Sequence, residues 1–535
     1  MVIAAFLACW MAPGIRAQSS ADPAGASLLE AGSGRVLLVL PFDNRSGQPN
    51  LEWVREAAAE LLSSRFASAG FEPTGRAKRV YALDHLGLPA GFQPSRASSI
   101  KLAQTLDADS VVVGDFRTDG SELVVEARLV DVPRLTMGEA VTARGEMRNL
   151  IDVFDSLAWK LTEKLDPSFT GREETFLAAG KDLRPDAYEQ YIRGVTDTDQ
   201  AERLSHLEQA VKLSPGFTPA WMALGREEYL EQQYEQAAQA FAKIGHDDSD
   251  ALEAGFYRGL SLVFSGSYAE AEKSFAEVAR ILPLAAVVND EGVAVSRQGH
   301  DATTLFVQAA AADPGDADYH FNLALSLHRQ KNTAAALNEL AQCLKLKASD
   351  SEAQALEQAW KRVGAPADAA TASTGAAADP LERIERSFDE QAFRQAASML
   401  DQLDSTRMAA LPPLERAQKL STQAKGYLDR GLLLEAERLY REAANADPSL
   451  AEAHAGLAEV SERSGDAAAA RKEAQAALAI SPSADADLVL ARQDLAAGAL
   501  SQAGAEAGEA LKLEPANQAA QELLREIETR TEQQK

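Results

Sequence analysis

The sequence has almost no cysteine and few aromatic residues. Cys9 and Cys343 are the two cysteines among 535 residues, and aromatic residues make up 6% of the chain. Because Cys9 falls in an N-terminal segment that we expect to be removed, no intramolecular disulfide is available. The cysteine content is therefore compatible with any cellular compartment.

The chain also lacks the short motifs that carry catalysis or metal binding. It contains no G-x4-G-K-[ST] phosphate loop, no H-E-x-x-H pair and no C-x-x-C pair. His320 and His328 are eight residues apart and can share a helix face, but no carboxylate or cysteine joins them as a third ligand. The acidic residues Asp247, Asp248 and Asp250 lack the spacing of a calcium loop. We therefore expect a protein that is not an enzyme and holds no cofactor or metal.

An excess of positive charge is missing as well. The formal net charge is −27. Residues 34–165 contain 16 basic and 18 acidic residues, a balance of −2, whereas residues 166–535 contain 36 basic and 60 acidic residues, a balance of −24. Because nucleic-acid backbones are neutralised by Lys and Arg, this composition argues against a nucleic-acid partner. The acidic balance is typical of a solvated surface that keeps the protein soluble.

Long hydrophobic runs are absent beyond the N-terminus. No later stretch reaches the roughly 18 apolar residues of a membrane span, so we expect no transmembrane segment in the mature chain. Val2 to Met11 carries no charge, Pro13 and Gly14 follow, and Ala17 is a small residue suited to cleavage. Residues 1–17 thus resemble a secretory signal peptide without its positive start, which predicts a periplasmic or otherwise exported protein. The apolar stretch before Cys9 is too short to favour a lipid anchor, and a cytoplasmic protein remains the alternative.

What the sequence does have is a repeat of 34 residues. Gly225, Tyr234, Ala237 and Phe241 recur one period later as Gly259, Tyr268, Ala271 and Phe275. In the C-terminal third, Gly431, Ala436, Ala443 and Pro448 recur as Gly465, Ala470, Ala477 and Pro482. A period of this length with small, aromatic and proline positions indicates an array of helix–turn–helix units. Gly225 and Gly259 fall midway along the first helix, where the lack of a side chain lets the second helix approach closely.

This pattern resembles the tetratricopeptide repeat. Trp221, Leu224 and Gly225 match the opening of its consensus, although Glu228 stands where a tyrosine is usual. We predict two all-α solenoid arrays, at residues 184–363 and 381–535, joined by a flexible Ala-rich linker at 364–380. Phe388 and Phe393 are interpreted as part of a divergent repeat that restarts the solenoid after the linker. Residues 517–530 are expected to form a polar closing helix.

The first third of the chain has a different pattern, in which strands and helices alternate. We expect buried strands at 36–40 and 110–113, a half-exposed strand at 123–132 and an edge strand at 137–147. Helices are expected at 51–69, 98–106 and 150–165. This order predicts a small α/β domain with a mixed sheet ahead of the solenoid.

The α/β segment also resembles a known family. The run from Leu40 to Gly47, L-P-F-D-N-R-S-G, is similar to the opening of the TolB amino-terminal-like family, and the resemblance continues through Gly114 and the turn at Asp119-Gly120 to cover residues 34–165. It implies a small mixed sheet flanked by helices and no enzyme activity. Related domains occur in envelope proteins and ahead of tetratricopeptide repeats in signalling and regulatory proteins.

The resemblance to tetratricopeptide arrays implies a concave groove lined by the first helix of each repeat. Mapped onto the first array, the groove positions predict a protein-binding site at Met222, Arg226, Tyr229, Phe256, Phe264, Arg297, Phe321, His328 and Arg329. Leu230 and Asn289 also map to the groove, whereas Leu260 and Val263 are candidates for packing between repeats. Exposed aromatic side chains with arginines are typical of interface hot spots. The equivalent positions of the second array are polar and indicate a different partner or none.

These features together predict a non-enzymatic scaffold of the bacterial cell envelope. We expect it to hold a peptide or helix of a protein partner in the groove of the first array. The alternative is a cytoplasmic signalling or regulatory adaptor, in which residues 1–17 are not a signal.

Overall fold

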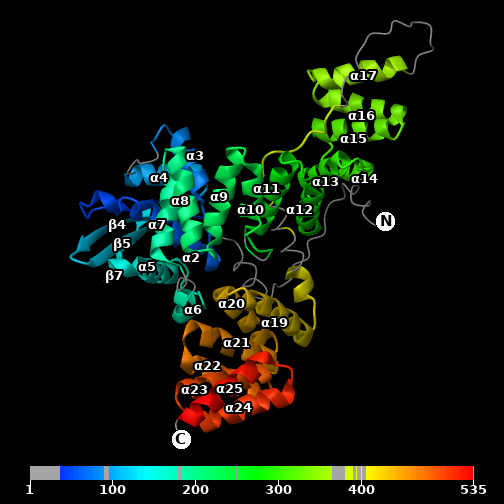
Figure 1. Ribbon diagram of the computed structural model, residues 1–535. Helices are drawn as coiled ribbons and strands as arrows, with labels where there is room; N and C mark the ends of the chain where they lie inside the picture. Colours follow the sequence, from blue (N-terminus) through cyan, green and yellow to red (C-terminus); the bar gives the residue numbers. More distant parts are fainter. Residues whose placement is uncertain are drawn as a thin grey trace, which may run out of the picture.

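A computed structural model of the protein describes residues 36–89, 95–178, 183–246, 248, 250–363, 380–388, 393, 399 and 405–533. The expected signal segment 1–17 with Cys9, and all of the expected linker except Pro380, lie outside these residues. The chain forms an N-terminal α/β domain followed by helices that stack in two arrays, as Figure 1 shows. The predicted fold class is confirmed.

The N-terminal domain is built on one mixed sheet. Its central strands are β1 (Val36–Val39), β4 (Ser110–Asp119) and β5 (Glu122–Asp131), of which β1 and β4 are parallel and β4 and β5 form an antiparallel hairpin. On the outer edges, β3 (Glu72–Pro73) pairs with β1, whereas β7 (Val141–Glu146) and the short β6 (Thr136–Met137) pair with β5. A two-residue strand, β2 (Asp43–Asn44), follows β1 and pairs in parallel with β4.

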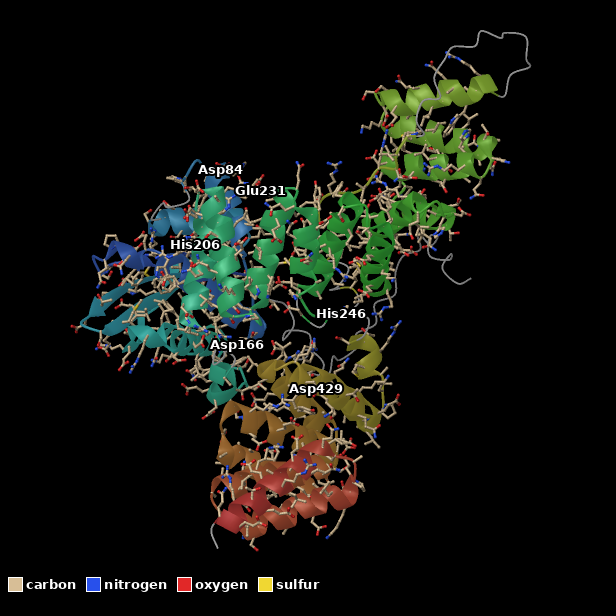
Figure 2. All side chains as sticks on the ribbon, in the orientation of Figure 1. Asp84, Asp166, His206, Glu231, His246 and Asp429 are labelled. Atoms are coloured by element: carbon tan, nitrogen blue, oxygen red, sulfur yellow. The ribbon has the colours of Figure 1, made fainter. Side chains whose placement is uncertain are left out.

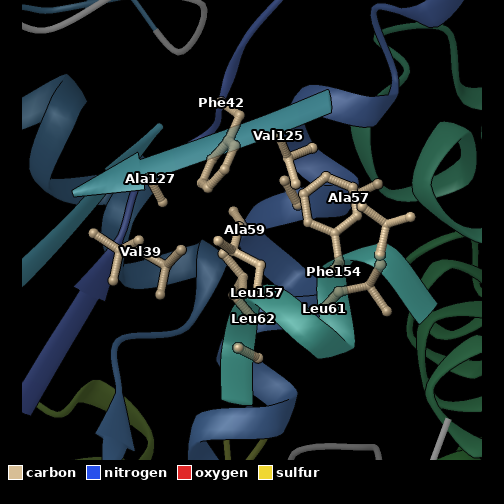
Figure 3. Close-up of a cluster of buried hydrophobic side chains, with 14 of the residues drawn as sticks. Val39, Phe42, Ala57, Ala59, Leu61, Leu62, Val125, Ala127, Phe154 and Leu157 are labelled. Atoms are coloured by element: carbon tan, nitrogen blue, oxygen red, sulfur yellow. The ribbon is translucent and has the colours of Figure 1, made fainter. Parts of the chain in front are cut away.

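Helices cover both faces of this sheet. The helices α2 (Val54–Ser68) and α5 (Leu150–Leu165) lie on one face and share its larger core (Figure 3). The opposite face is covered by α3 (Arg76–His85) and α4 (Arg96–Thr105). Because both faces are buried, β1 is apolar at every position, which is why its sequence is a continuous hydrophobic run. The sequence analysis did not predict α3, since only three of its ten residues are buried.

The Leu40–Gly47 run, on which the family resemblance depends, has a structural role here. A Cβ added at Gly114 would overlap the ring of Phe42, so the Phe42 side chain can occupy this place only because residue 114 is glycine. Asn44 Oδ1 accepts hydrogen bonds from the amide and the hydroxyl of Ser46, at 3.0 and 2.6 Å, and Gly47 has a φ of +71°. The run is therefore a packed strand end followed by a side-chain-stabilised turn.

The first array consists of paired antiparallel helices. Its helices are α7 (Pro185–Thr196), α8 (Gln200–Leu213), α9 (Thr218–Leu230), α10 (Tyr234–Phe241), α11 (Ala251–Phe264), α12 (Tyr268–Ile281), α13 (Ala285–Arg297), α14 (Thr303–Ala312), α15 (Ala317–Arg329), α16 (Thr333–Leu346) and α17 (Ser351–Val363).

The 34-residue period of this array has a steric cause. A Cβ at Gly225 would lie 2.8 Å from the ring of Phe241, and one at Gly259 would lie 2.6 Å from the ring of Phe275. Both rings are buried. In these two repeats the first helix must therefore have glycine where the phenylalanine of the second helix crosses it.

The second array comprises α19 (Pro413–Asp429), α20 (Leu433–Ala446), α21 (Ala451–Ser464), α22 (Ala467–Ile480), α23 (Ala484–Ala496), α24 (Leu500–Leu513) and α25 (Gln518–Gln533). Gly431 and Gly465 follow α19 and α21 with φ values of +78° and +91°, the left-handed conformation in which glycine ends a helix without strain. The expectation that Phe388 belongs to a repeat helix of this array differs from the structure. Residues 380–388 are extended and lie against the first array instead.

All three parts of the chain share contacts. Tyr188 and Ile192 of α7 belong to the same core as α2 and α5 of the N-terminal domain. The segment that follows α5 includes α6 (Glu173–Ala178), which packs on α20 and α21 of the second array. In that segment Arg172 pairs with Glu437 of α20 at 2.7 Å and with Asp466 at 3.1 Å. The second array is thus joined to the N-terminal domain through the segment that follows α5.

Candidate peptide-binding face of the first array

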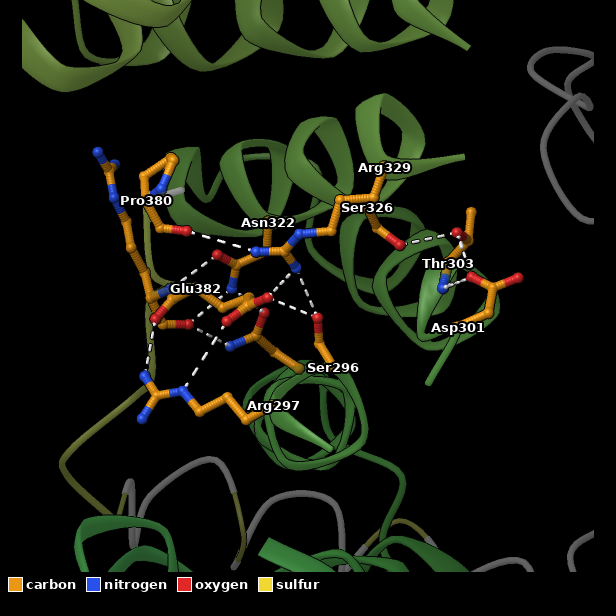
Figure 4. Close-up of polar contacts among 11 residues, drawn as sticks. Ser296, Arg297, Asp301, Thr303, Asn322, Ser326, Arg329, Pro380 and Glu382 are labelled. Carbon is orange, nitrogen blue, oxygen red and sulfur yellow. Dashed lines mark hydrogen bonds and ion pairs between the residues drawn. The ribbon is translucent and has the colours of Figure 1, made fainter. Parts of the chain in front are cut away.

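Residues 380–388, which we call the docked segment, cross the first array without forming a helix or a strand. The segment lies on the first helices of successive repeats, α15, α13 and α11, and on the start of α17 (Figures 1 and 4). We call this surface of the array the docking face. The chain runs along it in the direction opposite to the order of the repeats.

Two buried asparagines hold the backbone of the docked segment. Asn322 Oδ1 accepts a hydrogen bond from the amide of Arg383 at 2.7 Å, and Asn322 Nδ2 donates to the carbonyl oxygen of the same residue at 2.6 Å. Asn289 Nδ2 donates to that carbonyl at 3.1 Å, and the two asparagine side chains bond each other at 2.8 Å. Both asparagines are at most 1% exposed. Because these hydrogen bonds go to the main chain, they hold the backbone of the docked segment without depending on its side chains.

A cationic rim at the C-terminal ends of α13 and α15 holds Glu382. Arg329 forms an ion pair with its carboxylate, and Ser296 donates a hydrogen bond to it. Arg297 lies 3.8 Å from the carboxylate and donates to the carbonyl oxygen of Glu382 at 3.2 Å (Figure 4). Burial opposes the charge of Glu382, whose side chain is 2% exposed, but the hydrogen bonds from Ser296 and Arg329 outweigh it and the pKa of Glu382 lies below its usual value.

An anionic rim at the N-terminal ends of α15 and α17 holds Arg383. The guanidinium donates to both carboxylate oxygens of Asp350, at 2.6 and 2.9 Å, and to Asp318 at 2.7 Å and Glu352 at 3.1 Å. Its carbon lies 3.6 Å from the centre of the Phe321 ring, a cation–π contact. The hydrogen bonds from Arg383 lower the pKa of Asp350 to about 2. This fork-shaped pairing is the geometry that favours arginine over lysine.

The rest of the docked segment continues along α13 and α11. The amide of Glu385 donates to Asp290 Oδ1 at 2.9 Å. Because Asp290 is fully buried, burial raises its pKa well above the ordinary value. The guanidinium of Arg386 lies 5.2 Å from the ring of Phe264, and the ring of Phe388 lies 5.8 Å from that of Phe256. The segment ends in apolar contacts after beginning in ionic ones.

The nine residues predicted for the groove divide into two groups. Phe256, Phe264, Arg297, Phe321 and Arg329 contact the docked segment as described above. The contacts of the other four lie within the array itself. Met222 packs in a buried cluster, Arg226 pairs with Glu253, Tyr229 lies against three neighbouring aromatic rings, and the ring of His328 stacks on Trp360 at 4.0 Å.

Sequence reasoning missed most of the polar contacts of the docking face, as well as its occupant. The missed residues are Asp290, Ser296, Asp318, Asn322, Asp350 and Glu352. A signal was present in the pair Asn289 and Asn322, because they stand 33 residues apart, about one repeat. Amides at equivalent positions of successive first helices form a ladder along the array.

His320 and Cys343, which could have formed other sites, make structural contacts in the described residues. His320 bonds Glu339 at 2.7 Å, and Cys343 is buried in α16, where burial raises its pKa to about 11. Figure 2 shows His206 and His246 on separate elements of the first array. Over the ranges that the structure describes, no group of three His, Cys, Asp or Glu residues is arranged to hold a metal ion. A search of the same ranges for a helix long and apolar enough to cross a membrane found none.

Comparisons with known proteins agree with the repeat architecture. A family model for the tetratricopeptide repeat matches residues 296–353 and 421–485. Among solved structures, the chain is similar to YrrB, a tetratricopeptide protein, with 14% identity, a TM-score of 0.29, and 38% of this chain and 98% of that chain covered. MamA has 15% identity and a TM-score of 0.28, with 30% of this chain and 96% of that chain covered.

A third similar structure is the C-terminal domain of LpoB from Salmonella enterica, with 19% identity, a TM-score of 0.19, and 23% of this chain and 92% of that chain covered. No curated protein matches the sequence. The family model matches one stretch in each helical array, α13 to α17 in the first and α19 to α23 in the second. Both helical arrays of this chain therefore contain tetratricopeptide repeats.

Proposed function

We propose that this protein is a non-enzymatic scaffold of the bacterial cell envelope whose first array holds an extended segment of a partner protein in its groove. The observation that carries the proposal is the docked segment itself. The docking face binds a stretch of polypeptide through backbone hydrogen bonds to Asn289 and Asn322, flanked by charged rims. Tetratricopeptide arrays are binding surfaces in general, and this face already has the contacts that a peptide ligand requires.

The cellular location in this proposal rests on the signal-like residues 1–17 and on the resemblance of residues 34–165 to a family with envelope members. The second candidate is a cytoplasmic signalling adaptor, favoured by the same resemblance, because related domains also precede tetratricopeptide repeats in regulators. Mass spectrometry of the purified native protein separates the two. A mature N-terminus near residue 18 supports export, and retention of residues 1–17 supports the cytoplasmic adaptor.

Site-specific photo-crosslinking in the producing cells tests the binding role. A photo-reactive amino acid replaces Leu230, which is 69% exposed at the end of α9 and maps to the groove. The matched control carries it at Ile281, which is 46% exposed at the end of α12. We expect a crosslinked partner from position 230 and none from position 281. Equal yields at the two positions, or none at either, would contradict the proposed function.

A further inference from the structure

We propose that the docking face selects an extended peptide in which an acidic residue directly precedes an arginine, and that the docked segment occupies this face until such a ligand displaces it. The inference rests on the proposed function and assigns it a ligand class. Within the docked segment, Glu382 and Arg383 are the acidic–arginine pair that reaches the two rims, and Phe388 provides the aromatic anchor. The second such pair, Glu385 and Arg386, contacts Asp290 and Phe264 instead.

The order of the two charges is set by the two rims. Neighbouring side chains of an extended strand point to opposite sides, so adjacent residues reach opposite rims of the docking face. The cationic rim consists of Arg297 and Arg329, and the anionic rim consists of Asp318, Asp350 and Glu352. An exchanged pair, with arginine before the acidic residue, would place each charge beside charges of its own sign. Such repulsion disfavours wrong ligands in addition to the attractive contacts that favour the right one.

The asparagine ladder fixes the register of this pair. Asn322 binds both the amide and the carbonyl group of one residue, Arg383, so that residue must stand at this point of the face. The residue before it then faces the cationic rim. The two asparagines bind main chain, so they set the position of the acidic–arginine pair on the docking face but do not select its side chains. The charged rims make that selection.

Arginine is favoured over lysine at the second position. The Arg383 guanidinium bonds both oxygens of Asp350, and its carbon lies over the Phe321 ring, 3.6 Å from the ring centre. An ammonium group bonds as a point charge and cannot reproduce both contacts. A ligand with lysine in this place is therefore expected to bind more weakly.

Self-occupation has a consequence for affinity. An external peptide binds only the fraction of molecules whose docking face is open, so its apparent affinity falls by that fraction. The docked segment belongs to the same chain, which makes its return to the face intramolecular. Substitutions in the docked segment that weaken its contacts with the docking face are therefore expected to strengthen the binding of an added peptide.

The test measures binding of a labelled peptide by fluorescence anisotropy. The probe peptide has the sequence of residues 380–388, P-L-E-R-I-E-R-S-F, and the control peptide, P-L-R-E-I-R-E-S-F, has both of its Glu–Arg pairs in the exchanged order. The hosts are the full chain and its variant Glu382→Arg with Arg383→Glu. A second host, Arg383→Ala with Phe388→Ala, guards against partial docking of the reversed segment, and circular dichroism confirms that each host is folded.

We expect the probe to bind either variant at least tenfold more tightly than the parent chain, and the control peptide to bind each at least tenfold more weakly than the probe. Equal binding of the two peptides overturns the charge order, and equal binding of the probe to parent and variants overturns self-occupation. If no peptide binds while position 230 still crosslinks a partner, the ligand class is wrong and the proposed function stands. If no peptide binds and position 230 crosslinks no partner, both the ligand class and the proposed function are wrong. A change in the oligomeric state of the variants, measured by size-exclusion chromatography, would instead show that the segment docks between copies and would overturn displacement within one chain.

Discussion

The close contact between Gly259 and the Phe275 ring predicts that Gly259→Ala destabilises the parent chain but stabilises a chain that lacks the ring. Gly259 lies inside α11, where alanine is favoured over glycine by about 1 kcal/mol. However, a Cβ there would lie 2.6 Å from the ring of the fully buried Phe275, an overpacking that costs about 1–3 kcal/mol. We therefore expect Gly259→Ala to destabilise the chain by up to about 2 kcal/mol in the parent.

Removal of the ring reverses the effect of the alanine. Phe275→Ala alone should cost about 3–5 kcal/mol, as for other buried aromatic side chains. In that background the added methyl group has space, so Gly259→Ala should stabilise by about 1 kcal/mol. The difference between the two backgrounds is the coupling energy of the pair, and contacting residues are where such couplings occur.

The assay is urea unfolding, followed by circular dichroism, of four proteins: the parent chain, Gly259→Ala, Phe275→Ala and the double variant. Hydrogen exchange then localises the change in stability to α11 and α12. Gly508→Ala is the control, because Gly508 lies inside α24 and a Cβ there meets nothing within 4 Å. It should stabilise by about 1 kcal/mol in either background. If Gly259→Ala has the same effect with and without the Phe275 ring, the steric explanation of the repeat period is wrong.

Three further predictions concern other parts of the molecule. The pKa values of Asp350 and Glu382 lie below their ordinary values in the docked state. Docking should therefore be complete above the ordinary carboxylate range and should weaken as the pH falls toward 2. Hydrogen exchange of the docked segment at a series of pH values measures this weakening. Arg65→Met should destabilise the N-terminal domain by about 3–5 kcal/mol in urea unfolding, because it leaves Asp155, which is 1% exposed and bonded to Arg65 at 2.6 Å, without its charge partner. Limited proteolysis should cut first within the Ala-rich linker 364–380 and yield two folded fragments, whereas first cuts inside repeat helices would contradict that expectation.

The parts of the fold that sequence reasoning predicted are those with a local signal. The repeats follow from a glycine and an aromatic ring that cross once per period, and the strands β1 and β5 follow from apolar runs and alternation. The helix α3 was missed because it is mostly polar, and its buried Arg79 is satisfied by Glu56 and by the carbonyl oxygen of Val39, which only the folded domain supplies.

The occupant of the docking face has no local signal at all. Arg383 bonds Asn289 and Asn322, which precede it by 94 and 61 residues. Nothing in the periodicity around Phe388 distinguishes an extended ligand from a divergent repeat helix. Five of the nine predicted groove residues contact the docked segment, and their role in binding a partner stays a prediction.

The most direct test of the account is the exchange rate of two amide hydrogens in the parent protein at neutral pH. The amides of Arg383 and Glu385 donate to the buried side chains of Asn322 and Asp290. Docking predicts that both exchange at least about 100-fold more slowly than in an unstructured peptide, and that Asn322→Ala restores the fast rate at Arg383. Exchange of both amides at the unstructured rate in the parent would contradict the docking of residues 380–388 on the first array.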